Sequence, residues 1–515
     1  MESNKRLIFA LVLSVVVLLG SNVIIKKYFY KAPALVQQPA EEESAAGGRV
    51  KQDATKQQQR PKTAVQPRRK TSALRPAIRA AEENVVIETK KYQVIFSPQG
   101  CIEHWRLKEY KAKTGRGGIS EDPVDLAWGS DTGCLDQGYE VMPLKDGNGV
   151  SLWTEDEGVS VLKEFIFEED KYGAVVRFKI INASPYTKDV SLLRWGPGIA
   201  ETTQPREIAF TSYTGQEIKR YKAYKVKSTI KQGDVLWSGI TGQYFAFVVF
   251  PGAGSQELVI TEDDKKVCLE SVVENIPPGA TVSGDLKIYA GPRDYEKLKA
   301  EGQNLHLLIN FGFFGAIGKV IFAILKWLYK ITGNYGVAII LISVLIKIML
   351  FPLSRKGLKS MGDMQKVQPQ MEILKQKFKH DKEGLAKEQM ELYKRMGVNP
   401  LGGCLPMILQ LPIFFALFVV FRNAIELRQA PFIFWIKDLS APDPFYVLPI
   451  LMGITTFIQQ KMTPKTGASQ PAGMSYFMTI FLTFIFLKFQ AGLVLYWLTN
   501  NVLSIIEQQI IKRKA

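Results

Sequence analysis

One lysine stands inside a stretch that is otherwise apolar. Lys347 lies within residues 334–353 (NYGVAIILISVLIKIMLFPL), a run with the length of a membrane span. A charge at such a position costs about 2.5 to 3.5 kcal/mol on insertion scales, so ionisable residues inside spans are usually functional. Two interpretations are open: the ammonium group reaches the lipid headgroups, or it faces a hydrated cavity and attracts a polar or acidic passenger.

Polar residues also recur at helical spacing in the other apolar runs, as with Tyr496, Asn500 and Ser504 on one face. If these faces converge on the lysine, their hydroxyl and amide groups line a hydrophilic groove. For each residue taken singly, hydrogen bonding between helices is the alternative. The expected substrate groove consists of Lys347, Ser343, Gln410, Thr455, Thr483, Tyr496 and Asn500.

The apolar runs 337–353, 401–421, 445–460 and 474–506 contain no Asp or Glu. Carboxylates are the usual relays of proton and cation carriers, so this composition disfavours a proton-coupled carrier. No P-loop, H-E-x-x-H or G-x-S-x-G motif occurs, and the three histidines are widely separated. We therefore expect no enzyme, no metal site and no cofactor.

Six apolar runs approach the roughly 20 residues that a membrane span requires. We predict a polytopic α-helical membrane protein with six spans, of which the last five form a bundle. Residues 355–395 contain 11 Lys and Arg against 6 Asp and Glu, which indicates a cytoplasmic loop and places both termini in the cytoplasm. The predicted spans are a signal anchor in 1–27, span two in 334–354, span three in 398–422 and spans four to six in 444–512.

Residues 83–300 show short alternating segments separated by Gly, Pro, Asn and Asp, a pattern typical of an antiparallel β-sandwich. The predicted strand segments are 92–96, 173–182, 235–250, 266–273 and 281–290. This domain would be exported, between spans one and two. Its scattered tryptophans are expected in the core, and carbohydrate binding is the alternative.

Four connecting segments complete the chain. Residues 28–82 are predicted to be a disordered basic linker, and 423–443 an exported loop. Residues 301–333 are predicted to connect the β-sandwich to the membrane through an amphipathic interfacial helix, with 313, 317, 320, 324, 328 and 331 on its apolar face. Residues 355–397 are predicted to form a cytoplasmic helical hairpin. Its flexible partner-binding side chains would be Met361, Met364, Met371 and Phe378, and packing within the hairpin is the alternative role for them.

Several ordered stretches resemble the YidC/Oxa/Alb family of membrane protein insertases, in its Gram-negative form with a large periplasmic domain. They are 398–406 (VNPLGGCLP), 410–414 (QLPIF), 426–432 (ELRQAPF), 448–453 (LPILMG) and 492–497 (GLVLYW). The resemblance implies an inner-membrane insertase and chaperone that works alone or beside the Sec translocon. Its implied partners are nascent membrane proteins, the Sec translocon and the ribosome, the last through the cytoplasmic hairpin. Separately, the net charge of +17 is concentrated in the linker and in membrane-flanking loops, which favours anionic lipids and ribosomal RNA over DNA as partners.

The resemblance also implies a mechanism. In the family, a groove open to the cytoplasm and the lipid holds one cation that attracts the hydrophilic tail of an incoming protein. Lys347 matches that position, where bacterial members usually have arginine; lysine keeps the charge without the planar fork. The apolar segment would slide along Pro406, Pro412, Phe414, Phe481 and Trp497. The alternatives are a small-solute channel or carrier, and a glycan-binding envelope protein.

Overall fold

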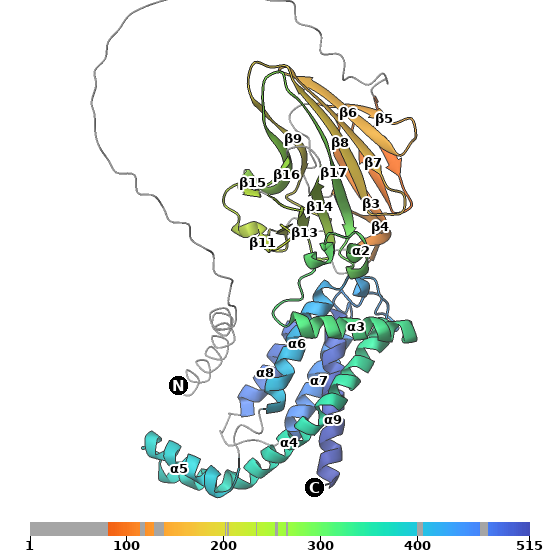
Figure 1. The fold of residues 1–515 in the computed structure, drawn as a ribbon. Coiled ribbons are helices and arrows are strands. Elements are labelled where there is room, and N and C mark those ends of the chain that lie inside the picture. Colours follow the sequence, from red (N-terminus) through yellow and green to blue (C-terminus); the bar gives the residue numbers. More distant parts are fainter. Residues whose placement is uncertain are drawn as a thin grey trace, which may run out of the picture. The chain divides into compact units, whose positions relative to one another are not determined.

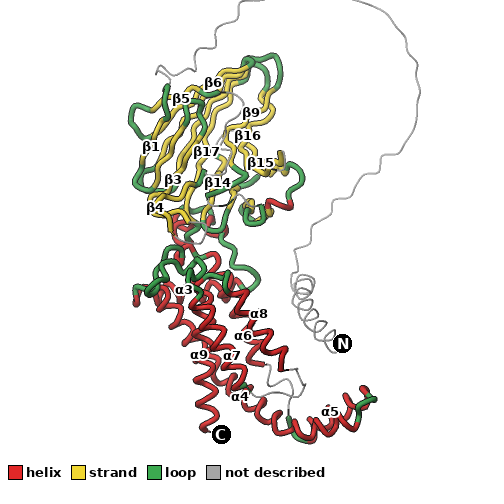
Figure 2. The backbone as a smooth tube through the Cα atoms, turned by 180° about the vertical axis from the view of Figure 1, so that it is seen from behind, coloured by secondary structure: helices red, strands yellow, loops and turns green. Residues whose placement is uncertain are grey.

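The computed structural model describes residues 81–113, 119–127, 138–200, 202, 205–232, 234–252, 256–263, 266–398, 405–463 and 472–514. The predicted signal anchor, 1–27, and nearly all of the predicted linker, 28–82, lie outside these residues. A β domain spans the strands from Val85 to Pro292, and helices follow it from Tyr295 to Lys514 (Figures 1 and 2).

The β domain is an antiparallel β-sandwich. Its strands are β1 (Val85–Glu88), β2 (Tyr92–Phe96), β3 (Ile102–Lys113), β4 (Ile119–Asp125), β5 (Glu140–Pro143), β6 (Gly149–Asp156), β7 (Val159–Phe167), β8 (Gly173–Asn182), β9 (Lys188–Trp195), β10 (Ala209–Tyr213), β11 (Ile218–Lys222), β12 (Ile230–Gln232), β13 (Trp237–Thr241), β14 (Phe245–Pro251), β15 (Gln256–Asp263), β16 (Lys266–Ile276) and β17 (Thr281–Pro292). They form a sheet β1-β2-β3-β4, a sheet β11-β10-β13-β14-β17-β8-β7-β6-β5 and a sheet β12-β15-β16-β9. Alternating buried residues along strands such as β2 turn one face of each strand into the core.

Three tryptophans lie in the centre of this core. Trp105, Trp195 and Trp237 are fully buried. The ring centroids of Trp105 and Trp195 are 6.1 Å apart, and Trp195 stacks on Phe247 at 4.0 Å. The expectation that these tryptophans are core residues is confirmed, so none of the three offers its ring face to a sugar.

The helical part begins immediately after β17. Its α-helices are α2 (Tyr295–Ala300), α3 (Gly315–Thr332), α4 (Tyr335–Lys377), α5 (Lys382–Arg395), α6 (Leu405–Asn423), α7 (Val447–Met462), α8 (Ala472–Phe486) and α9 (Ala491–Lys514). Short 3-10 helices are η1 (Ala223–Lys225), η2 (Leu305–Leu308) and η3 (Ile425–Leu427). A second apolar core joins α3, α4, α6, α7 and α9 through small and large side chains together, including Ala338, Ile342, Ala416, Leu417, Met452 and Val494.

Helix α4 is longer than the sequence suggested. Asn334 caps it, because its side chain accepts hydrogen bonds from Gly336 N at 2.8 Å and Val337 N at 3.2 Å. The helix then continues for 43 residues through Pro352 and Pro369 (Figure 1). Predicted span two and the first arm of the predicted hairpin are therefore one continuous helix, because a proline in a long helix bends it without ending it when packing holds both sides.

By length and composition, the described residues contain one helix that is long and apolar enough to cross a membrane, α4. Two shorter apolar helical segments accompany it, Gln410–Asn423 and Phe477–Phe486. Helices α7 and α8 have 16 and 15 residues, fewer than the roughly 20 that a span requires. The predicted count of six spans therefore remains a proposal.

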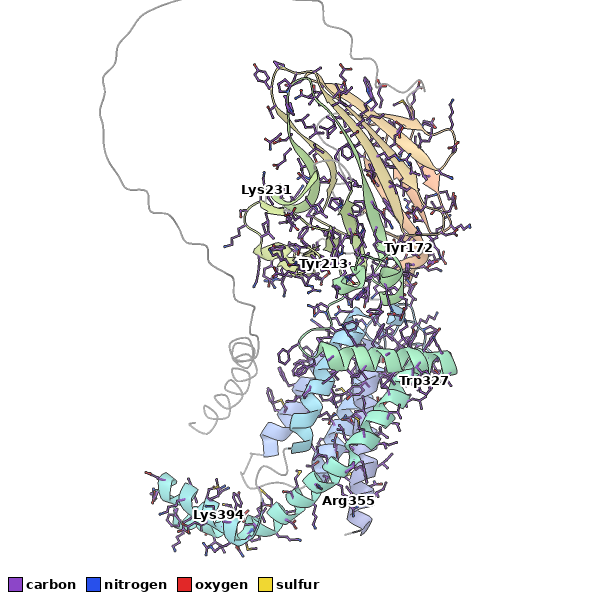
Figure 3. All side chains as sticks on the ribbon, viewed as in Figure 1. Tyr172, Tyr213, Lys231, Trp327, Arg355 and Lys394 are labelled. Atoms are coloured by element: carbon purple, nitrogen blue, oxygen red, sulfur yellow. The ribbon has the colours of Figure 1, made fainter. Side chains whose placement is uncertain are left out.

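Helix α3 has two apolar faces, and the sequence indicated only one of them. Gly318, Ile321, Phe322, Leu325 and Leu328 are buried against the helical core. Of the face predicted from the sequence, only Leu328 belongs to this buried set. Val320 and Ile331 are 58% and 64% exposed, and Trp327 projects from the helix at 58% exposure (Figure 3). The predicted apolar face is thus mostly exposed, and tertiary contacts bury a neighbouring stripe that the sequence did not indicate. The interfacial position of the helix stays a prediction.

Candidate functional site

Lys347 lies on α4, and its charge is paired. Its Nζ lies 2.8 Å from Oε2 of Glu507 on α9, and its side chain is 16% exposed. The same Nζ donates a hydrogen bond of 2.8 Å to Oγ of Ser504, which in turn donates to Asn500 O at 2.8 Å. Lysine, serine and glutamate thus form one hydrogen-bonded cluster between two helices.

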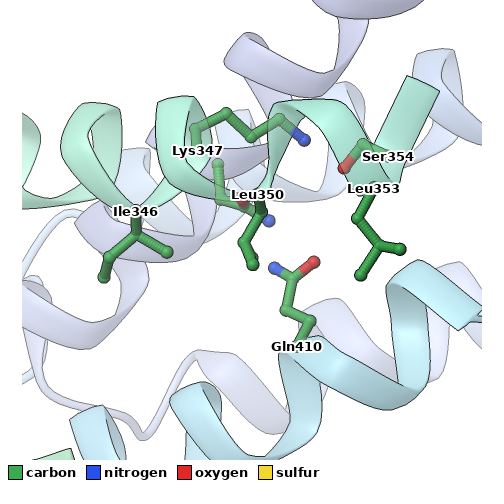
Figure 4. A pocket seen from close by; sticks show the side chains of 7 residues that line it. Ile346, Lys347, Leu350, Leu353, Ser354 and Gln410 are labelled. Atoms are coloured by element: carbon green, nitrogen blue, oxygen red, sulfur yellow. The ribbon is translucent and has the colours of Figure 1, made fainter. Parts of the chain in front are cut away.

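A small pocket lies beside this cluster. Its volume is about 10 Å³, room for roughly one water molecule. Figure 4 shows Lys347, Leu350 and Ser354 of α4 on one side and Gln410 of α6 opposite them. The lining residues are Ile346, Lys347, Leu350, Leu353, Ser354, Gln410 and Asn500. Three of the seven residues predicted for the groove therefore meet here: the lysine, the glutamine and the asparagine.

Glu507 is the residue that sequence reasoning missed. It is 5% exposed, and its second oxygen, Oε1, has no hydrogen-bond partner among the described residues. The apolar run considered in the sequence ends at Ile506, one residue earlier, while α9 continues to Lys514. The spacing of Tyr496, Asn500 and Ser504 already pointed to it, since Glu507 stands one helical turn further on the same face.

The pairing corrects two expectations. The sequence predicted a single cation in the polar site, whereas the structure places the carboxylate of Glu507 beside it. The absence of carboxylates from the apolar runs therefore no longer argues against a carrier. Two charges buried together cost desolvation energy that their attraction offsets only with good geometry and further hydrogen bonds. Here the lysine has such bonds, whereas Glu507 has one oxygen left over. Among the described residues, no group of three or more His, Cys, Asp or Glu is arranged to hold a metal ion.

The other four residues predicted for the groove lie outside the pocket lining. Ser343 is buried and donates to Ile339 O of its own helix at 2.6 Å. Thr455 donates to Leu451 O and Met452 O, and Thr483 donates to Thr479 O. Tyr496 is 2% exposed and hydrogen-bonds to Gln410, which connects it to the pocket through one neighbour.

Much of the polar pattern in α7, α8 and α9 holds helices together. Asn501 Nδ2 donates to Thr456 Oγ1 at 2.8 Å and to Thr455 Oγ1 at 3.3 Å. Thr479 Oγ1 donates to Gln460 Oε1 at 2.7 Å, which links α8 to α7. These contacts are interhelical hydrogen bonds of the kind that polar residues form between apolar helices. Asn501 had not been singled out in the sequence.

An open apolar groove of about 940 Å³ runs between α7 and α8. Its lining is almost wholly hydrocarbon, with Thr479 and Thr483 as the polar exceptions. The lining residues are Tyr446, Ile450, Gly453, Ile454, Phe457, Thr479, Ile480, Thr483, Phe484 and Leu487. Gly453 allows close contact of the two helices, because a Cβ there would collide with Thr483 Oγ1. The volume and the apolar lining of this groove suit an apolar segment.

The five predicted slide residues divide between the interior and the surface. Phe414 and Trp497 are half-buried and meet edge to face, with ring centroids 5.1 Å apart. Pro412 is half-buried inside α6. Phe481 is 48% exposed on α8 and stacks on Phe477 at 6.0 Å. Pro406 belongs to α6, and its side chain lies outside the described residues.

Of the four predicted hairpin residues, two are buried and two are half-buried. Met364 and Met371 of α4 are buried with Val367, Leu392 and Tyr393 in a small apolar cluster that joins α4 to α5. Met361 and Phe378 are half-buried. The buried methionines therefore hold the hairpin closed and do not offer their thioethers to a partner. Ile373, Met390 and Met396 are exposed there instead.

Comparison with known proteins gives the family. The family model described as 60Kd inner membrane protein matches residues 327–515, and the YidC periplasmic domain model matches residues 114–324. The chain is 37% identical over 453 residues to the membrane protein insertase YidC of Geobacter sulfurreducens, covering 83% of this chain and 85% of that protein. It is 37% identical over 470 residues to the YidC of Geotalea daltonii, covering 86% and 89%. From these matches over most of its length, the chain belongs to the YidC family of membrane protein insertases.

Proposed function

We propose that this chain is an inner-membrane insertase and chaperone, which inserts and folds integral membrane proteins alone or beside the Sec translocon. The observation that carries the proposal is 37% identity to proteins named membrane protein insertase over more than four fifths of the chain. The proposed partners are nascent membrane proteins, anionic lipids and the ribosome. The ribosome would bind the hairpin formed by α4 and α5. The chain catalyses no covalent reaction in this account.

The proposed topology has six spans, with both termini in the cytoplasm and the β-sandwich in the periplasm. The excess of Lys and Arg in residues 355–395 supports a cytoplasmic hairpin. The exposed apolar side chains of α3 support a helix that rests on the outer leaflet, with Trp327 suited to the headgroup zone.

In the proposed mechanism, the hydrophilic tail of the substrate is received at the polar site around Lys347 while its apolar segment lies against the helices. The pocket there has room for about one water molecule, so α4, α6 and α9 move apart to admit the tail. Gln410 and Asn500 line the same pocket and supply neutral donors and acceptors for peptide groups. The apolar segment follows the exposed Phe481 and the groove between α7 and α8. Transfer of about 20 apolar residues into the bilayer supplies the driving force, so no nucleotide is required.

The test is insertion of a small single-span protein with an acidic N-terminal tail into liposomes containing the purified chain, scored by protease protection. We expect wild type and Lys347→Arg to insert it, and Lys347→Ala to insert it about tenfold less, because only the first two keep a cation. Glu274→Gln is the matched control, since it removes a Lys231–Glu274 pair of 2.6 Å in the β domain.

Equal insertion by all three proteins would show that Lys347 is a passive residue whose charge the bilayer tolerates. Failure of all three to exceed empty liposomes would contradict the insertase proposal itself and favour a channel or a glycan-binding protein.

A further inference from the structure

In the buried pair, Lys347 has two hydrogen-bond partners, whereas one oxygen of Glu507 has none among the described residues. The ammonium has three N–H groups, and it contacts Ser504 Oγ and Glu507 Oε2, each at 2.8 Å. Glu507 is 5% exposed, and its Oε1 has no hydrogen-bond partner among the described residues. A buried carboxylate oxygen without a donor is costly, so it marks a place where a ligand group would gain a bond.

The residues that line the pocket supply no further charge next to Lys347. The pocket beside Lys347 is lined by Ile346, Leu350 and Leu353 and by the neutral polar groups of Gln410, Asn500 and Ser354. No second charged side chain takes part in that lining. Glu507 is not part of that lining, but its Oε2 lies 2.8 Å from the Lys347 ammonium. A tail carboxylate that binds the ammonium therefore also approaches the carboxylate of Glu507.

We propose that Glu507 is a specificity-determining residue for insertion: its carboxylate competes with acidic side chains of the incoming tail for Lys347 and offers Oε1 to basic ones. This inference rests on the proposed role of the Lys347 site in receiving the tail. Glu507 weakens the site's preference for acidic tails and admits tails that carry a lysine or arginine. A lysine without this partner would select acidic tails alone.

The experiment uses the full chain in liposomes and three probe proteins, identical single-span proteins whose tails carry Asp, Asn or Lys at one position. Initial insertion rates are measured by protease protection for wild type, Glu507→Gln, and the double variant Lys347→Gln with Glu507→Gln. We expect Glu507→Gln to raise the ratio of the Asp-tail rate to the Lys-tail rate about tenfold, the low end of the coupling of close charge pairs. The double variant should show nearly equal rates for the three tails.

A buried lysine without a counter-ion can destabilise the fold, so Glu507→Asp provides a second measurement. It keeps the charge but shortens the side chain by one methylene group, and it should move the same ratio in the same direction by about threefold. Glu274→Gln in the β domain should leave the ratio at its wild-type value.

Two results would overturn the inference, and they are distinguishable. If Lys347→Ala impairs the Asp-tail probe but Glu507→Gln and Glu507→Asp leave the ratio unchanged, Glu507 is a structural counter-ion and the proposed site stands. If Lys347→Ala has no effect with any tail, the proposed role of the site fails, and the inference fails with it.

Discussion

At the scale of single residues, the ion pair with Glu507 changes the role expected for Lys347. A lone cation in an apolar run favours acidic tails, whereas in our proposal a cation already paired with Glu507 has a weaker preference for acidic tails and admits basic ones. The attraction between the two charges and the bond from Lys347 to Ser504 offset part of the desolvation cost of burying them, while Glu507 Oε1 stays without a partner among the described residues. The lysine is thus compatible with both a stable bundle and a responsive site.

A second buried carboxylate, Glu426, gives a pH prediction. Burial raises its pKa to about 7 from an ordinary value near 4.5, with Asp294 and Glu296 adding to the effect and Lys326 opposing it. A raised carboxyl pKa means that ionisation costs folding energy, and this cost appears as the pH rises from about 4.5 to about 7. Oε1 of Glu426 has no hydrogen-bond partner among the described residues, in agreement with a group that prefers to stay protonated.

We therefore expect Glu426→Gln to stabilise the full chain by about 1 to 2 kcal/mol at pH 8 and to change little at pH 4, where the native side chain is neutral. The measurement is the midpoint of thermal unfolding in detergent across this pH range. Glu391→Gln, at an exposed position on α5, is the control and should leave the midpoint unchanged. A stability difference that does not vary with pH would contradict the assignment.

At the scale of elements, α4 joins the polar site to the helical hairpin that it forms with α5. Met371 follows Lys347 by 24 residues on one helix, a distance of about 36 Å along its axis. Pro352 and Pro369 each remove a backbone hydrogen bond, so the helix has two defined places to bend. A partner that moves the hairpin would act on the site through this helix.

The packing of α4 against α5 is also testable. Met371 is 1% exposed within the small cluster, so Met371→Ala should weaken the hairpin by about 2 to 4 kcal/mol through lost contacts and a cavity. Amide hydrogen exchange in α5 should become markedly faster. Met390→Ala is the matched control, because Met390 is 58% exposed on α5 and should leave the exchange rates unchanged. Equal exchange in both variants would show that the cluster does not hold the hairpin.

Period-two and period-3.6 patterns predicted most elements but not their partners. The predicted segments 92–96 and 173–182 coincide with β2 and β8, since alternation of buried residues decides where a strand lies. The continuity of predicted span two with the first arm of the hairpin was not predicted, because polarity changes along α4 while its helical backbone does not. Glu507 was missed because a hydropathy run ends where charge begins, although a helix face continues.

At the scale of the whole molecule, the exported domain and the helices share polar contacts. Arg428, which follows η3, donates to Lys111 O at 2.6 Å and lies over the ring of Tyr244, 5.5 Å from its centroid. Gln490 Nε2 donates to the hydroxyl oxygen of Tyr244 at 3.1 Å. Such long-range contacts cannot be read from one sequence, because neither residue type nor spacing names the partner. The contacts of Arg428 connect the loop after α6 to β3 and to the turn before β14, and the contact of Gln490 connects the residue before α9 to the same turn.

The central claim is that the tail of a substrate occupies the polar site while its apolar segment occupies the surface of α7 and α8. Photocrosslinking tests it directly, with a photoreactive side chain placed at Asn500, at Gln410 or at Ile450 in the full chain, and a single-span substrate stalled during insertion. The account predicts that Asn500 and Gln410 positions crosslink to the hydrophilic tail, and that the Ile450 position crosslinks to the apolar segment. Crosslinks from Ile450 to the tail, with none from Asn500 or Gln410, would contradict it.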